Sequence, residues 1–161
     1  MNVVFLDYDG VVNTPMWEYD PAKKKWKCRY GQPLDGKVNN TQAVQWVSEF
    51  CENHHYAIVV TSTWRIDDDK WRHYLEWAGL RNTVEIIGRT PVLSDKKRGD
   101  EISAYLADHP EITGYLIFDD ETDMGEHITR LVRCDPGHGF GLPEYNMAYL
   151  LHCAYNAEEK I

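Results

Sequence analysis

The stretch Val3-Val4-Phe5-Leu6-Asp7-Tyr8-Asp9-Gly10 gives the first strong indication of how this chain folds. Residues 3–6 form a continuous apolar run, which is typical of a strand buried on both faces. The run ends at Asp7 and is broken at Gly10. In an open parallel sheet, ligands bind beyond the carboxyl ends of the strands, so carboxylates at this point indicate a site. A lone D-x-D-G pattern is also common in turns, so the rest of the sequence has to distinguish a functional site from a simple turn.

Two further apolar runs, 57–60 and 115–118, end at Thr61 and Asp119 in the same way. Helical spacing of apolar residues alternates with these runs. The segments with that spacing are 44–51, 71–78, 102–106 and 147–154, and weaker strand candidates are 84–87 and 128–132. Asn40 is a plausible N-cap for the first helix, and Pro143 is well placed to open the last. The alternation predicts an α/β fold, a three-layer α/β/α Rossmann-like arrangement around a mainly parallel sheet.

The length of 161 residues fits one domain over 1–161, with one segment outside the alternation. Residues 14–38 hold several Pro and Gly residues around two aromatic runs, 16–19 and 26–30, and we expect a β-hairpin flap there. Residues 16–30 carry five cations against Glu18 and Asp20, a local balance of +3, which leaves −12 on the rest of the chain. Aromatic and basic residues interleaved in this way suit nucleic-acid binding. Cross-strand packing with solubilising lysines explains them equally well.

The net charge of −9 argues against general binding to nucleic acids or anionic membranes, unless a local basic patch provides it. Four cysteines without a C-x-x-C pair favour neither zinc nor a disulfide framework. We find no signal peptide and no apolar stretch of the roughly 20 residues that span a bilayer. The sequence therefore predicts a reduced, cytoplasmic protein and leaves the oligomeric state open.

Three polar clusters follow the three main strands and should converge at one edge of the sheet. They are Asp7 with Asp9, Thr61 with Ser62, and Asp119 with Asp120. Several carboxylates in one crevice repel each other unless a cation lies among them. Mg²⁺ is bound by carboxylates, waters and substrate phosphate, so these residues predict a magnesium site.

With these clusters the chain resembles the haloacid dehalogenase superfamily of phosphohydrolases over nearly its whole length. The motif h-h-h-D-x-D-G corresponds to residues 4–10, and the other signatures follow in the family's order. The resemblance implies that Asp7 is the nucleophile, which forms an aspartyl-phosphate, and that Asp9 is the general acid and base. It places Gly10 among the residues next to the substrate.

The resemblance also assigns the remaining parts of such a site. Thr61 and Ser62 would hold phosphoryl oxygens, without a basis for choosing between them. The Mg²⁺ ligands would be Asp7, the backbone carbonyl of Asp9, Asp119 and Asp120, with Asp123 as a further candidate. A basic residue opening a later helix would neutralise the phosphorylated aspartate; Arg98 is favoured, and Lys97 and Lys96 remain alternatives.

Short motifs at 61–65, 98–102, 118–120 and 141–142 resemble the small phosphatase domains associated with RNA repair proteins, relatives of the 3′-phosphatase domain of polynucleotide kinase-phosphatases. In that resemblance Arg65 would contact substrate phosphate; pairing with Asp67–Asp69 is the alternative. The spacing from Thr61 to Arg98 leaves no room for a large cap domain, which suits a large substrate.

Three functions remain open from the sequence. The first is a phosphomonoesterase acting on nucleic-acid ends, 3′-phosphates among them, or on nucleotides. The second is a phosphatase of phosphoproteins or small metabolites. The third is a catalytically silent domain that binds a phosphorylated ligand or a partner protein.

Overall fold

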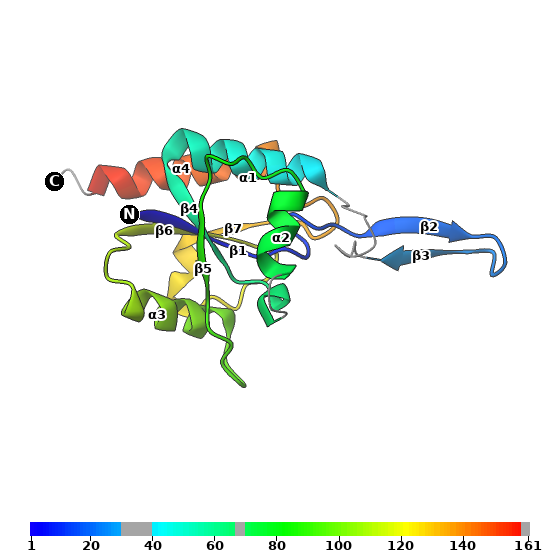
Figure 1. The fold of residues 1–161 in the computed structure, drawn as a ribbon, viewed down its shortest axis with the longest axis horizontal. Helices are drawn as coiled ribbons and strands as arrows, with labels where there is room; N and C mark the ends of the chain where they lie inside the picture. Colours follow the sequence, from blue (N-terminus) through cyan, green and yellow to red (C-terminus); the bar gives the residue numbers. More distant parts are fainter. Residues whose placement is uncertain (30–39, 67–69, 159–161) are drawn as a thin grey trace.

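The computed structural model describes residues 1–29, 40–66 and 70–158. Its centre is a five-stranded parallel sheet in the order β5-β4-β1-β6-β7 (Figure 1). The strands are β1 (Asn2–Leu6), β4 (Tyr56–Val60), β5 (Ile86–Arg89), β6 (Gly114–Asp119) and β7 (Leu131–Arg133). The predicted α/β fold is therefore confirmed, and the strand that carries the D-x-D-G motif lies in the middle of the sheet.

Helices cover both faces of this sheet. On one face lie α1 (Thr41–His54) and α4 (Leu142–Glu158), and on the other lies α3 (Arg98–Asp108) (Figure 1). The smaller elements are α2 (Lys70–Trp77) and the 3-10 helices η2 (Thr63–Ile66) and η3 (Gly125–Arg130). Alternate residues of β1 serve the two faces: Val4 and Leu6 belong to the core under α1, whereas Val3 and Phe5 pack in the core under α3.

Local chemistry explains where α1 begins and ends. The side chain of Asn40 accepts a hydrogen bond from the backbone N–H of Ala43 at 2.9 Å, so it caps the helix as its residue type predicts. At the other end His55 adopts the left-handed conformation, with φ of 58°, and its N–H bonds back to the carbonyl of Cys51. This helix thus stops directly before β4.

The two weaker strands are the elements that the sequence placed less well. We expected them at 84–87 and 128–132, and they occupy 86–89 and 131–133. Val84 is held in a turn by the carbonyl of Arg81, at 3.0 Å. Ile128 lies in η3 and is exposed. Both strands lie at the edges of the sheet, where partial exposure weakens the apolar signal.

The hairpin was predicted correctly over the part of 14–38 that the structure describes. Strands β2 (Met16–Asp20) and β3 (Lys25–Arg29) pair antiparallel, and they project away from the sheet (Figure 1). Lys24 lies in the connecting turn with φ of 48°. Residues 30–38 of the expected flap lie outside the described residues. None of the described helices is long and apolar enough to cross a bilayer.

Candidate active site

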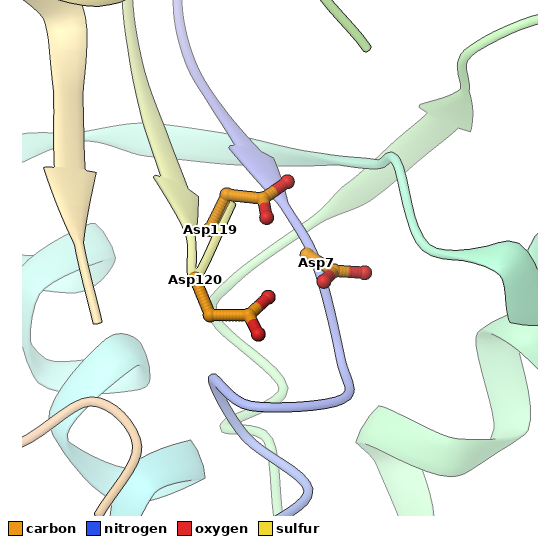
Figure 2. Close-up of side chains that lie close together, drawn as sticks. All are labelled: Asp7, Asp119 and Asp120. Carbon is orange, nitrogen blue, oxygen red and sulfur yellow. The ribbon is translucent and has the colours of Figure 1, made fainter. Parts of the chain in front are cut away.

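Three carboxylates meet where β1 and β6 end (Figure 2). Asp7 directly follows β1, Asp119 is the last residue of β6, and Asp120 comes next. One oxygen atom from each lies within 4.8 Å of the others. Asp7 and Asp119 are buried and Asp120 is partly buried. The parallel pairing of β1 with β6 brings together residues that are more than 110 positions apart in the sequence.

Gly10 makes room for this cluster. Its φ is +84°, and a Cβ atom at this position would lie 2.6 Å from Oδ2 of Asp120. Its N–H donates to the carbonyl of Asn13 at 2.8 Å. We expected Gly10 among the residues next to the substrate. The backbone donor of Gly10 is used within the turn, and the glycine admits the side chain of Asp120, so its contact with a substrate stays a prediction.

The cluster holds more negative charge than its protein surroundings balance. Burial is the main reason that the pKa values of Asp7 and Asp119 are raised, and Arg98 offsets part of the effect in both. The guanidinium of Arg98 lies 3.8 Å from Oδ1 of Asp7 and 3.4 Å from Oδ2 of Asp119. Oδ2 of Asp119 is buried and receives no hydrogen bond from the described part of the chain. A buried carboxylate oxygen that accepts no hydrogen bond, in an excess of carboxylates, fits a hard divalent cation with oxygen ligands.

Of the three basic candidates, Arg98 is the one whose side chain the structure brings to the carboxylates. Lys96 and Lys97 are exposed. Arg98 is the first residue of α3, and its backbone N–H donates to Oδ2 of Asp123 at 3.1 Å. We expected Asp123 behind the metal site. Asp123 accepts this hydrogen bond at the start of α3 and is not one of the three carboxylates whose oxygens lie within 4.8 Å of one another, so its part in the metal site stays a prediction.

The hydroxyl groups after β4 differ in their partners. Thr61 is buried, and its Oγ1 has no hydrogen-bond partner among the described residues. Oγ of Ser62 accepts the backbone N–H of Trp64 at 3.3 Å. The geometry therefore favours Thr61 over Ser62 as the hydroxyl available to a phosphoryl oxygen.

Asp9 is held at both of its carboxylate oxygens. Asn13 donates from Nδ2 to Oδ1 at 2.6 Å, and the indole Nε1 of Trp64 donates to Oδ2 at 3.0 Å. The sequence did not indicate either partner, although Trp64 lies inside the T-S-T-W-R motif. A tryptophan in such a motif is a weak signal for a donor to a carboxylate, and Asn13 carries no signal of its own.

Arg65 has a different role from the one predicted. It is only 4% exposed, and it donates hydrogen bonds to the carbonyls of Thr61 at 2.6 Å, Ser62 at 2.8 Å and Thr90 at 3.1 Å. It also forms an ion pair with Glu101 at 2.5 Å. The prediction that Arg65 contacts substrate phosphate is therefore wrong, because its buried guanidinium binds backbone carbonyls and Glu101 instead. Its alternative partners Asp67–Asp69 lie outside the described residues.

The pair of Arg65 and Glu101 joins the loop after β4 to α3. Oε1 of Glu101 also accepts the backbone N–H of Leu93 at 3.2 Å, and Oε2 lies 3.8 Å from Nη1 of Arg98. The sequence missed Glu101, which was visible only as the fourth residue of an R-x-x-E-I motif. Two segments of the candidate site, one with Thr61 and one with Arg98, are thus fixed relative to each other.

In this chain a buried aspartate follows the central strand, and a pair of aspartates and an arginine lie beside it. This arrangement is typical of the haloacid dehalogenase class of α/β proteins. A family model described as the HAD domain in Swiss Army Knife RNA repair proteins matches residues 3–144. The chain belongs to this family, and its domain type is that of phosphatase-like hydrolases. A search of the curated proteins found no match.

Proposed function

We propose that this protein is a Mg²⁺-dependent phosphomonoesterase that works through an aspartyl-phosphate and acts on phosphorylated nucleic-acid ends. The observation that carries the proposal is the cluster of Asp7, Asp119 and Asp120 within 4.8 Å, with the guanidinium of Arg98 beside it. A silent binding domain has no need to bury a nucleophile among other carboxylates, since that burial costs stability.

The metal would be held by Asp7, Asp119, Asp120 and the backbone carbonyl of Asp9. When bound, Mg²⁺ would neutralise negative charge on the nucleophile and on the transferring phosphoryl group. The three carboxylates of the cluster are the oxygen ligands such an ion prefers, and burial, offset only in part by Arg98, raises the pKa values of Asp7 and Asp119.

The chemistry of the protein's own residues follows in two steps. A carboxylate oxygen of Asp7 forms a bond to phosphorus, while the bond from phosphorus to the leaving oxygen breaks and Asp9 gives that oxygen a proton. Water then attacks the aspartyl-phosphate as Asp9 takes back a proton, which releases inorganic phosphate and restores Asp7. Thr61 and Arg98 would hold the phosphoryl oxygens throughout.

Two observations support a nucleic-acid end as the substrate. Between β4 and α3 the described residues form only η2, α2 and β5, so that side of the crevice has no cap domain. The hairpin of β2 and β3 carries exposed Lys23, Lys24 and Lys25 at its tip, in a chain that is otherwise strongly acidic. The open crevice also suits a phosphoprotein, which is the second candidate and the reason for a comparative test.

The first test is phosphate release by wild type and Asp7→Asn on one panel of substrates. The panel contains an aryl phosphate, nucleotides, a phosphopeptide, and oligonucleotides with 3′- or 5′-phosphate ends. We expect release that requires both Mg²⁺ and Asp7, fastest on an oligonucleotide. Asp108→Asn, an exposed carboxylate at the far end of α3, serves as the control and should behave as wild type. Mg²⁺ binding without turnover of any substrate would refute the enzymatic proposal.

The second test concerns the hairpin. Replacing Lys23, Lys24, Lys25 and Lys27 by Gln should raise KM for an oligonucleotide and leave KM for the aryl phosphate unchanged. If these lysines meet phosphates as proposed, removing four positive charges should also flatten the salt dependence of binding. Equal effects on both substrates would argue against nucleic acid and favour the phosphoprotein or metabolite alternative.

A further inference from the structure

Helix α4 carries apolar side chains on its outer face as well as on its inner face. The inner residues Tyr145, Ala148 and Leu151 pack on the core shared with α1. On the outside, Leu150 is 62% exposed and Met147 49% exposed. The other exposed outer residues are Leu142, Pro143, Asn146, Tyr149, Cys153, Ala154 and Ala157. A helix that is apolar all round is usually buried on all sides, so this face indicates a contact with another surface.

The outer face of α4 also lacks charge. No Asp, Glu, Lys or Arg occurs between Glu144 and Glu158, although 27% of the chain consists of these residues. Charged groups appear at the margin of the helix, with Glu144 in its first turn and the guanidinium of Arg130 lying 3.6 Å from the ring centre of Tyr155. An apolar centre with charges at its margin is the typical anatomy of a protein interface. In a chain with net charge −9, this is a face on which two copies do not repel each other.

The order of side-chain sizes along the face indicates which surface fits it. The larger side chains Pro143, Asn146 and Met147 lie toward the start of α4, and the small ones Cys153, Ala154 and Ala157 lie toward its end. An antiparallel copy with its two-fold axis at Leu150 places the large residues of one helix opposite the small residues of the other. Alternating large and small residues across facing positions let two helices pack closely. The face is therefore self-complementary, as a two-fold interface requires.

We propose that a second copy of this chain docks on the outer face of α4, antiparallel and centred at Leu150. The helix is about 25 Å long at 1.5 Å per residue, so the contact is at the small end of specific interfaces and we expect a dissociation constant on the order of 10 μM. Helix α4 is antiparallel to the strands of the sheet (Figure 1). In the antiparallel dimer, the two candidate active sites, which lie at the carboxyl ends of the strands, therefore face opposite directions. The layer of α4 lies on the side of the sheet away from α3, so both crevices stay open (Figure 1).

The experiment is sedimentation velocity over 1 to 200 μM, roughly spanning the expected dissociation constant. Wild type should shift from monomer to dimer, and Leu150→Glu should stay monomeric through the whole range with unchanged circular dichroism. Val92→Glu changes an apolar residue that is 56% exposed in a loop away from α4, and it should dimerise as wild type does. A monomeric wild type at 200 μM, or a dimer that Leu150→Glu leaves intact, would overturn the proposal.

A cross-link tests the antiparallel register separately. Met147→Cys lies opposite the exposed Cys153 of the other copy in this arrangement, so mild oxidation should give a covalent dimer linked between positions 147 and 153. Peptide mass spectrometry identifies the linked pair. A dimer linked only between identical positions would rule out this register. These measurements do not depend on phosphatase activity, so they stand whether or not the proposed reaction is found.

Discussion

Trp64→Phe tests whether the proposed general acid depends on the indole that holds it. The substitution keeps an aromatic ring beside Tyr74, whose ring centre lies 5.2 Å from that of Trp64, and removes the Nε1 donor to Asp9. The bond from Asn13 to the other oxygen of Asp9 remains. The carboxyl group is then free to rotate about that single contact, which would lower the fraction of molecules in which it faces the leaving oxygen.

The expected loss follows from the type of hydrogen bond removed. A hydrogen bond to a charged group contributes about 1.5–3 kcal/mol, and each 1.36 kcal/mol corresponds to about tenfold in rate, so kcat should fall about 10- to 100-fold. The loss should appear where the leaving oxygen needs a proton, as in an alkyl or nucleoside phosphate. A dinitrophenyl leaving group departs without a proton, so its turnover should change by less than about threefold.

The assay is kcat for a series of phosphate esters with leaving groups of increasing basicity, measured for wild type, Trp64→Phe and Trp46→Phe. Trp46 is a partly buried tryptophan that packs on the core of α1 and makes no contact with the candidate site, so its variant should match wild type. A uniform loss across the series would show that Trp64 acts only through the local fold. No loss on any ester would refute the role assigned to the indole.

Three further outcomes follow from the geometry. Gly10→Ala should raise the Mg²⁺ concentration for half-maximal activity at least tenfold, because its Cβ meets Asp120, a carboxylate of the proposed metal site. Gly125→Ala, also at positive φ but with nothing within 4 Å, should not. Glu101→Gln leaves the buried guanidinium of Arg65 without its counter-charge. The free energy of unfolding should therefore fall by about 3–5 kcal/mol, and Tm in a thermal melt should fall by about 10 °C. A decrease in Tm of less than about 2 °C would contradict a buried ion pair. Burial raises the pKa of Asp7 to about 6 and that of Asp119 to about 8. The folded state then holds protons more tightly than the unfolded state, and without Mg²⁺ its stability should fall as pH rises through these values; the slope should be smaller in Asp119→Asn and with Mg²⁺ present.

Continuous apolar runs made the central strands predictable. The segments 3–6, 57–60 and 115–118 lie in the core of the sheet, so each gives a continuous apolar run that is recognisable as a strand. Because these strands pair in parallel, the residues that follow them lie at the same edge of the sheet. The edge strands were placed one to three residues off, because most of their residues are only partly buried and give a weak apolar signal.

The basic residue and the supporting contacts were less predictable for a different reason. Whether Arg98 or Lys97 faces the carboxylates depends on where α3 begins, and that position is supported by a hydrogen bond that the N–H of Arg98 donates to Asp123, 25 positions away. Arg65 and Trp64 likewise owe their roles to Glu101 and Asp9, which lie on other segments. Such contacts between distant segments leave no periodic pattern in the sequence. The sequence therefore identified these residues as candidates but not the residues that they bind.

The central place of β1 bears on how the protein is made. Strand β1, which leads to Asp7, precedes the other strands of its sheet in the chain, so both of its neighbours, β4 and β6, are synthesised later. At typical translation rates roughly 10 seconds separate Asp7 from Asp119. During that time an apolar strand has no partner on one side, and the nascent chain is exposed to chaperones and to aggregation. A product truncated before β6 would contain the D-x-D-G motif and lack Asp119 and Asp120, so the cluster of three carboxylates is complete only after translation passes Asp120.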